Sequence, residues 1–329
     1  MLAELRAVLE ADLPAQDDAV KLSGILYDRC YSHSILDAGL VGQALPPANP
    51  DLTGALSPET GDTEAAWQAK APAPPSPDLT DALAAANQSR GAWVEGWRID
   101  QVLDDGRILA RKSGALRSFL PGQYVTSRGL GSGPEEGMEI TVFMTPGSAD
   151  FQQMFYWAFG ETISEFEPSA SVLRIYWNIQ VPGAPRLMEA LTRELNRFQL
   201  PFRFKCLNHT SHFPRRDAAV LYIHRRYYPI AALLVERVHG EVRQWLNQST
   251  PLFTRPLSHG LALAENPGES FGNHRCAILA AAMTASRGQA VEARLDEVRR
   301  QFQERGLSLD TPWLNANSPG DYEYPFALE

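Results

Sequence analysis

The chain has 329 residues, of which 44% are hydrophobic and 21% are charged, and its formal net charge is −9. These values are typical of a globular protein with enough residues for one large core or two modest ones. The acidic balance argues against nonspecific binding of nucleic acid or an anionic membrane, because such binding needs a basic surface. We therefore expect no nucleic acid and no membrane among the partners.

The cysteines and the hydropathy pattern indicate a cytoplasmic protein. Cys30, Cys206 and Cys276 form no CxxC pair and lie among apolar residues, as reduced thiols do. The first residues lack a basic segment followed by a long apolar run, so we expect no secretory signal. No stretch reaches the roughly 18 uncharged apolar residues of a membrane span.

The chain divides into three parts. Residues 1–44 show helical periodicity, with Leu2, Leu5, Val8 and Leu9 on one stripe, and predict an N-terminal helical segment. Residues 45–80 are rich in proline, alanine and acidic residues, which is typical of a linker or a long surface loop. Residues 81–329 are expected to form an α+β domain.

Within this domain, a short helix is expected near residues 81–87, and residues 92–145 read as strands separated by turn signals such as "DDG" and "GSGPEEG". Beyond Asp150 we expect helices in "DFQQMFYWAFGE", "APRLMEALTRELNRF", "YPIAALLVERVHGEVRQWLN", "NHRCAILAAAMTA" and "AVEARLDEVRRQFQERG". Strands are expected in "SVLRIYWNI", "FRFKCLN", "DAAVLYIHRR" and "SHGLALAEN". Strands and helices in blocks predict an α+β fold with a mostly antiparallel sheet, flanking helices and the N-terminal helical segment.

Two of these strands carry polar residues on one face. Alternation puts Arg203 and Lys205 of "FRFKCLN" opposite an apolar face. In "LRIYWNI" the polar face holds Arg174, Tyr176 and Asn178. If the two strands lie near each other, these five side chains converge on one concave surface. The alternative for each strand is a solvated surface with no function.

Further basic residues begin other elements. "PRRDAAVLY" supplies Arg215, Arg216 and Asp217, and "ESFGNHRC" places His274 and Arg275 in the first turn of a helix, where an anion is favoured. Guanidinium groups together with a helix N-terminus suit a phosphate group. Arg275 could instead form a salt bridge, and Arg215 and Arg216 could be a solvated pair with Asp217 as their partner.

These segments resemble a known family. The runs "LRIYWNI", "LTRELNRFQLPFRFKCLNHTSHFPRRDAAVLYI" and "PLFTRPLSHGLALAENPGESFGNHRCAILAAAM" are similar to the HopA-type family, named for a plant-pathogen type III effector. The early "ILYDRCYSHSI" also resembles that family's N-terminal helix. The resemblance covers roughly residues 20–40 and 90–290. It leaves open that the protein is secreted as an effector.

The resemblance implies a lyase chemistry. Relatives in thioamide and class V lanthipeptide clusters are assigned the elimination of phosphate from phosphoserine or phosphothreonine of a precursor peptide, which a separate kinase-like protein phosphorylates. More distant phosphothreonine lyases use a lysine as base, an acid for the leaving group and basic residues for the phosphate. The implied reaction needs neither a cofactor nor a metal.

Carried over to this chain, the resemblance implies Lys205 as the base, since neighbouring cations favour a neutral amine. It implies phosphate binding by Arg174, Arg203, Arg216, Arg275 and Asn178. Tyr176 stands where the distant lyases suggest a histidine, so Tyr176, His274 or His212 could be the acid, or the phosphate could leave unprotonated.

Two other functions are compatible with the same residues. Cys206, His209 and His212 could hold zinc, but no fourth ligand is evident. A non-catalytic effector-like module could use the same basic groove to bind a phosphorylated or acidic peptide. The sequence does not separate binding phosphate from eliminating it.

Overall fold

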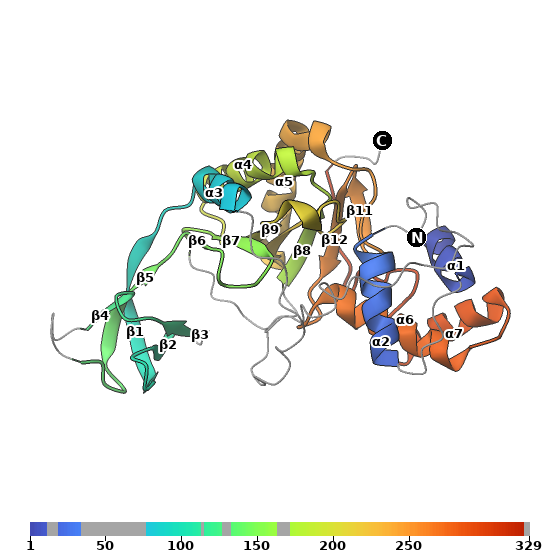
Figure 1. The fold of residues 1–329 in the computed structure, drawn as a ribbon, viewed down its shortest axis with the longest axis horizontal. Helices are drawn as coiled ribbons and strands as arrows, with labels where there is room; N and C mark the ends of the chain where they lie inside the picture. Colours follow the sequence, from blue (N-terminus) through green and yellow to red (C-terminus); the bar gives the residue numbers. More distant parts are fainter. Residues whose placement is uncertain (12–18, 34–76, 113–114, 127–132, 163–171, 326–329) are drawn as a thin grey trace.

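The computed structural model describes residues 1–11, 19–33, 77–112, 115–126, 133–162 and 172–325. Its strands form two sheets, one in the order β3-β2-β1-β5-β4 and one in the order β11-β12-β8-β10-β9-β7-β6. All strand pairs described within them are antiparallel. With the helices packed beside these sheets (Figure 1), the predicted α+β fold is confirmed.

The smaller sheet forms a lobe beside the main body (Figure 1). Its strands are β1 (Ala92–Val102), β2 (Ile108–Lys112), β3 (Ala115–Phe119), β4 (Tyr124–Thr126) and β5 (Glu139–Met144). It has its own core, in which Trp97, Ile99 and Ile108 are almost completely buried. The lobe therefore has its own apolar interior, separate from that of the main body.

The larger sheet lies at the centre of the main body. Its strands are β6 (Gly147–Ser148), β7 (Phe155–Phe159), β8 (Val172–Trp177), β9 (Arg203–Leu207), β10 (Ala219–His224), β11 (Arg255–Ser258) and β12 (Leu261–Glu265). The strands β7, β8, β10 and β12 are buried almost throughout because helices pack beside the sheet.

Helices cover both faces of the larger sheet (Figure 1). The described helices are α1 (Leu2–Glu10), α2 (Ala19–Leu26), α3 (Pro77–Ala86), α4 (Ala184–Arg197), α5 (Tyr228–Val242), α6 (Phe271–Ala285) and α7 (Val291–Gln303). Of these, α7 packs on α6 and α1 packs on α7, away from the sheet (Figure 1). A π-helical turn, η1 (Tyr27–Tyr31), extends α2, and 3-10 turns occupy Val181–Gly183, Thr210–His212, Arg225–Tyr227 and Arg243–Trp245. No helix in the described ranges is long and apolar enough to cross a membrane.

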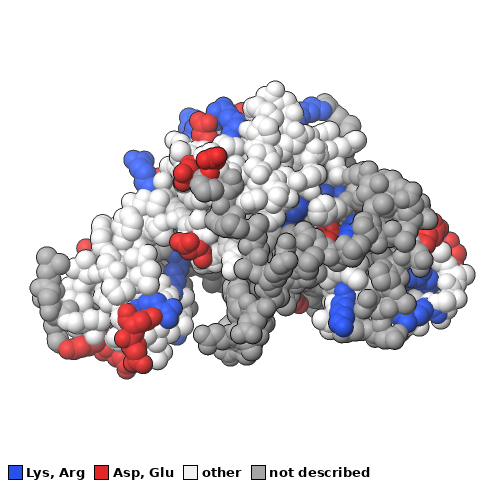
Figure 2. Space-filling model, viewed as in Figure 1, with Lys and Arg blue, Asp and Glu red and all other residues white. Residues whose placement is uncertain are grey.

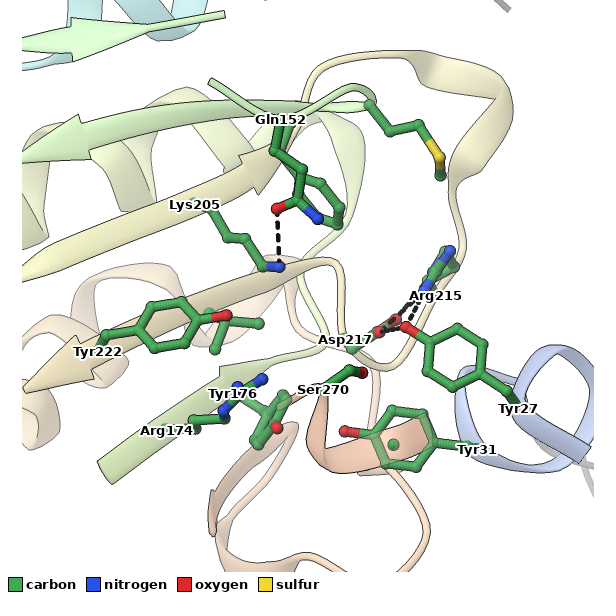
Figure 3. Close-up of a pocket in the computed structure, with 14 residues that line it drawn as sticks. Tyr27, Tyr31, Gln152, Arg174, Tyr176, Lys205, Arg215, Asp217, Tyr222 and Ser270 are labelled. Carbon is green, nitrogen blue, oxygen red and sulfur yellow. Dashed lines mark hydrogen bonds and ion pairs between the residues drawn. The ribbon is translucent and has the colours of Figure 1, made fainter. Parts of the chain in front are cut away.

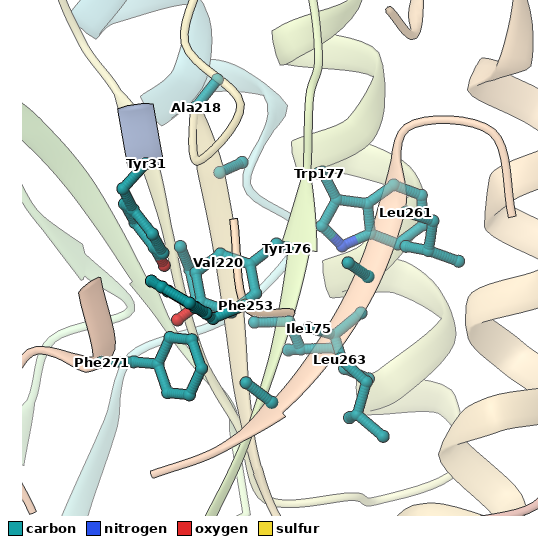
Figure 4. Packing of buried hydrophobic residues seen from close by; sticks show 14 of the residues in the cluster. Tyr31, Ile175, Tyr176, Trp177, Ala218, Val220, Phe253, Leu261, Leu263 and Phe271 are labelled. Atoms are coloured by element: carbon teal, nitrogen blue, oxygen red, sulfur yellow. The ribbon is translucent and has the colours of Figure 1, made fainter. Parts of the chain in front are cut away.

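The alternation of β8 decides which helices each face meets. Trp177 points toward α5, where its ring lies 6.3 Å from that of His239. On the opposite face Tyr176 meets Tyr31 and Phe271, at centroid distances of 6.5 and 6.4 Å. Figure 4 shows Tyr31 and Phe271 on one side of the strand and Trp177 on the other. The predicted polar face of β8 is thus covered by η1 and α6.

One expected helix is wrong. The segment 150–161 contains the strand β7, and Phe155, Tyr156, Trp157 and Ala158 are all buried. A strand buried on both faces loses the alternation that would distinguish it from a helix. The helix expected near residues 81–87 is α3, which begins at Pro77. Residues 45–76, which form most of the expected linker, lie outside the described residues.

The start of α6 packs closely on the N-terminal segment. A Cβ added at Gly272 would lie 2.5 Å from the Tyr31 ring and 2.6 Å from the Tyr27 ring. These two rings stack on each other at 5.3 Å. Glycine at position 272 therefore lets both tyrosines approach the first turn of α6.

We expect Gly272→Ala to destabilise the protein by about 1–3 kcal/mol, because the added methyl group overpacks this contact. Gly240→Ala is the matched control. Gly240 also lies within a helix, but nothing lies within 4 Å of its added Cβ, so the gain in helix propensity should be neutral or stabilising. Urea unfolding of both variants checks the prediction, and equal stabilities for the two variants would contradict it.

Candidate functional site

Three adjacent strands bring the predicted base and acid into one row. The strand β10 lies between β8 and β9, so that Tyr176 pairs with Val220 and Val220 pairs with Lys205. The next row on the same face consists of Arg174, Tyr222 and Arg203. Because valine is shorter than the residues on either side, space opens above Val220 between Tyr176 and Lys205.

This space is a pocket of about 520 Å³, counted with its open mouth. The wall combines the sheet face with η1, the start of β7, the loop before β10 and the start of α6 (Figure 3). The lining residues are Tyr27, Tyr31, Gln152, Met154, Phe155, Arg174, Tyr176, Lys205, Arg215, Asp217, Val220, Tyr222, Ser270 and Gly272. Lys205, Arg174 and Tyr176 thus line one pocket.

Aromatic rings surround the amine of Lys205, which is only 9% exposed. Its Nζ lies 4.3 Å from the ring centroid of Phe155, 5.3 Å from Trp157 and 5.8 Å from Tyr222. The same Nζ donates a hydrogen bond of 3.2 Å to Gln152 Oε1. Ring faces and a neutral amide orient the amine without neutralising an ammonium charge.

Arg174 is buried and held by neutral acceptors. Its Nε and Nη2 donate to Asn266 Oδ1 at 3.0 and 2.6 Å, and Nη2 also donates to the Glu269 carbonyl at 2.7 Å. The guanidinium carbon lies 5.1 Å from the Tyr222 ring centroid. These contacts fix the guanidinium through neutral oxygen acceptors and a ring face.

The N-terminus of α6 forms the adjacent wall. Ser270 is the N-cap, and its side chain accepts a 3.4 Å hydrogen bond from the Asn273 backbone. Both Ser270 and Gly272 line the pocket. The first turn of a 15-residue helix contributes a partial positive charge next to Arg174.

The pocket holds one carboxylate, and an arginine pairs with it. Arg215 donates from Nε and Nη2 to the two oxygens of Asp217, both at 2.8 Å. Tyr27 donates to Asp217 Oδ2 at 3.2 Å and accepts from Arg215 at 3.1 Å. Burial raises the pKa of Asp217, but the charge and hydrogen bonds of Arg215 outweigh it, and the net shift is downward. Asp217 therefore stays ionised.

Tyr176 carries a buried hydroxyl in the pocket wall. Burial raises its pKa to about 12, so the hydroxyl is protonated at neutral pH. No described residue makes a hydrogen bond of good geometry to it, although a hydrogen-bonding interaction with the nearby Tyr31 acts to lower its pKa. The pocket wall therefore contains a protonated hydroxyl beside Tyr31.

Two of the predicted phosphate ligands lie elsewhere. Arg216 forms a buried ion pair with Glu4 at 2.7 Å, and its backbone N–H donates to Ser32 at 2.8 Å. Arg275 is 0% exposed and donates to the carbonyls of Pro312 and Leu314, both at 2.8 Å. Neither lines the pocket. Arg216 connects the site loop to α1, and Arg275 connects α6 to the C-terminal segment.

Four other predicted residues also lie away from the pocket wall. Asn178 donates to the Ser249 carbonyl at 2.9 Å and fixes a loop. His274 contacts Arg275, and burial followed by that charge lowers its pKa to about 4, so it is neutral at neutral pH. Arg203 lines a second hollow, beside the small sheet. His212 is buried outside the pocket, with its ring 5.2 Å from that of His209.

The alternative metal site has no support from the described residues. Within them, no three His, Cys, Asp or Glu side chains are grouped to hold a metal ion. Cys206 is fully buried, and burial raises the pKa of its thiol to about 12, which disfavours the thiolate that zinc binds.

Several lining residues were missed in the sequence. Tyr27 and Tyr31 are four positions apart in "YDRCY", a spacing that places two side chains on one helical face. That signal was available. No such signal was present for Gln152, because this residue precedes β7, a strand whose sequence reads as a helix. Asp217 was considered only as the partner of a solvated arginine pair, whereas its pair with Arg215 is buried.

We expect Asp217→Asn to lower the stability by about 3–5 kcal/mol, because it leaves Arg215 buried without its counter-ion. Because the folded pKa of Asp217 is depressed, its contribution is present above the unfolded pKa of about 3.9 and is lost as the pH falls through the folded pKa. Thermal unfolding as a function of pH tests both points. The control Asp296→Asn removes an exposed pair with Arg299 and should change little; equal effects would refute the assignment.

The comparisons with known proteins give the family. The model of the HopA1 effector protein family matches residues 147–314, just over half of the 329-residue chain. No curated protein matches.

Among solved structures, the effector protein from Pseudomonas syringae pv. tomato strain DC3000 is 16% identical, with a TM-score of 0.44, over 74% of this chain and 84% of that chain. The effector protein from Pseudomonas syringae pv. syringae strain 61 is 15% identical, with a TM-score of 0.43 and the same coverage. The matched region includes β8, β9, β10 and the start of α6, and these elements carry Arg174, Tyr176, Lys205 and Ser270. On this match the chain belongs to the HopA1 effector protein family.

Proposed function

We propose that the protein eliminates phosphate from phosphoserine or phosphothreonine residues of a precursor peptide that a separate kinase-like protein has phosphorylated. The observation that supports this most is the shared pocket of Lys205, Arg174 and Tyr176. An amine, a guanidinium and a protonated hydroxyl around one cavity are the groups that this reaction uses.

The reaction is a β-elimination. The neutral amine of Lys205 takes the proton from Cα, and the electron pair of the broken C–H bond forms the Cα=Cβ double bond. The Cβ–O bond breaks at the same time, and phosphate leaves with its electron pair. The product is a dehydroamino acid in the peptide. Protein side chains alone carry out these reaction steps, so the proposal includes no cofactor.

The pocket supplies the electrostatics for the leaving group. Among the described residues that line it, three are cationic (Lys205, Arg174 and Arg215) and one, Asp217, is a carboxylate. The start of α6 adds a partial positive charge. This net positive field favours a phosphate dianion, and it favours the departing phosphate most as charge develops on it. Tyr176 is placed to donate a proton or a hydrogen bond to it.

One observation favours a second function, a module that binds a phosphorylated or acidic peptide without reaction. Three ring faces and Gln152 surround the amine of Lys205, and the carboxylate of Asp217 lies within electrostatic range. These contacts stabilise the ammonium form, which is the form that binds phosphate and cannot take a proton. For the elimination to proceed, substrate binding must therefore move some of these groups away from the Lys205 amine or outweigh their stabilisation of the ammonium form.

The decisive experiment is incubation of the purified protein with a phosphothreonine peptide and mass spectrometry. We expect the loss of phosphoric acid from the peptide. Lys205→Ala should lower the rate by at least about a hundredfold, because it removes the base. The control Lys112→Ala, in the small sheet, should keep the rate.

An active Lys205→Ala variant would exclude Lys205 as the base. Wild-type protein that binds the phosphopeptide, measured by fluorescence anisotropy, but never releases phosphate would instead support the binding module.

We expect Tyr176→Phe to keep the fold, since it removes one buried hydroxyl to which no described residue makes a good hydrogen bond. If Tyr176 protonates the leaving group, kcat falls about a hundredfold while KM changes little. Tyr222→Phe, in the same pocket, is the comparison variant. A fall in affinity with unchanged kcat would show that Tyr176 only binds the phosphate.

A further inference from the structure

A second hollow lies where the small sheet meets the main body. Its empty space is about 500 Å³, counted with its open mouth. The lining residues are Arg90, Ala92, Val94, Arg117, Met144, Thr145, Phe159, Gly160, Glu161, Thr162, Phe202 and Arg203. Residues of β1, β3 and β5 thus face residues of β7 and β9 across it. On the face shown in Figure 2, basic side chains are visible where the small sheet turns toward the main body.

Two arginines from different sheets line this hollow. Arg117 of β3 is half-buried, and burial followed by the charge of Arg203 lowers its pKa. Its Nη1 approaches Met144 Sδ, a weak acceptor, at 3.8 Å, and its guanidinium carbon lies 5.9 Å from the Trp97 ring centroid. The two guanidinium groups therefore lie close enough for their like charges to interact, and both line the hollow.

The carboxylate on the rim is already paired. Arg90 donates to Glu161 Oε1 from its backbone N–H at 3.1 Å and from Nε at 3.3 Å. Glu161 therefore pairs with the exposed Arg90 at the edge. The remaining walls are apolar, from Val94, Met144 and Phe202, with hydroxyl groups of threonine beside them. Such walls suit the methylene groups of a side chain that ends in a charge.

The hollow is connected to the first pocket along β9. Arg203 and Lys205 are two positions apart and point to the same face, so their Cα atoms are separated by about 7 Å. The Tyr222 ring lies between, with the guanidinium carbons of Arg174 and Arg203 at 5.1 and 5.8 Å from its centroid. At about 3.3 Å per extended residue, a peptide reaches from one site to the other within two to four residues.

We propose that this hollow is a specificity subsite that takes an acidic side chain, aspartate or glutamate, two to four residues from the phosphorylated residue of the substrate peptide. The inference rests on the proposed function for the identity of the first pocket. The carboxylate sits between Arg117 and Arg203, and its methylene groups lie against the apolar wall. The protein thereby selects phosphorylated sites in an acidic sequence context.

The test uses full-length protein and fluorescent phosphothreonine peptides with one glutamate placed from four residues before to four residues after the phosphothreonine. Each peptide has a glutamine counterpart. Fluorescence anisotropy gives Kd, and mass spectrometry gives the elimination rate. We expect glutamate at one favoured position to bind about tenfold tighter than glutamine, as charge-assisted hydrogen bonds do. Added salt should reduce this ratio.

Arg117→Gln should bring the glutamate-to-glutamine affinity ratio to about one. Arg98→Gln removes the same charge from an exposed position on β1 outside the hollow and should keep the ratio. The subsite is overturned if the wild type gives a glutamate-to-glutamine affinity ratio near one at all positions, or if Arg117→Gln leaves the ratio unchanged. It is also overturned if the protein binds none of the peptides. A preserved ratio without elimination overturns the lyase and keeps the subsite. Phosphoserine at the favoured position tests a second phosphate; if it binds tighter than glutamate, the assignment to acidic residues is wrong.

Discussion

The register of β8, β10 and β9 is the constraint on which the pocket depends. Residues on a strand alternate between faces, so a slip of one position would turn Lys205 away from the pocket and Phe204 into it. The opposite face prevents such a slip. Phe204 and Trp177 are completely buried there, with Trp177 near His239 of α5, and exposing either would cost several kcal/mol of apolar burial. The apolar core therefore determines where the reactive amine points.

Given this register, the way each cation is held determines the charge of the pocket. Arg215 is neutralised by Asp217, which also receives the Tyr27 hydroxyl. Arg174 donates to an amide and a carbonyl, and Lys205 contacts ring faces and an amide, so neutral groups orient both cations. Orientation without neutralisation is what an anion site needs, because a permanent carboxylate beside each cation would cancel the field that attracts the ligand.

The sequence predicted the faces of the strands better than the fate of individual arginines. Alternation correctly placed Arg174 with Tyr176 and Arg203 with Lys205, because strand geometry is local. It did not show that β10 lies between the two strands, nor that Val220 makes room for the pocket. Those facts depend on pairing between distant segments. The segment 150–161, which contains β7, was read as a helix because burial on both faces of β7 removes its periodicity.

Arg216 and Arg275 show the same limit. Both stand at the start of an element, a position that favours anion binding, and that is all a single sequence reveals. In the structure their partners come from Glu4 and from the 312–314 carbonyls, hundreds or tens of residues away. A basic residue near a helix start is therefore ambiguous until the rest of the chain is placed.

The N-terminal segment shows why the site cannot be reduced to the family-matched region. That match begins at residue 147, yet Tyr27 and Tyr31 form one wall of the pocket. Gly272 admits both rings against α6, and Tyr27 completes the hydrogen bonds of Asp217, the carboxylate that holds Arg215. Residues 19–31 are therefore part of the site's ionic network as well as of its hydrophobic packing. Without them Asp217 would lose a donor and the start of α6 would lose its apolar cover, so the charge and the shape of the pocket both depend on this segment.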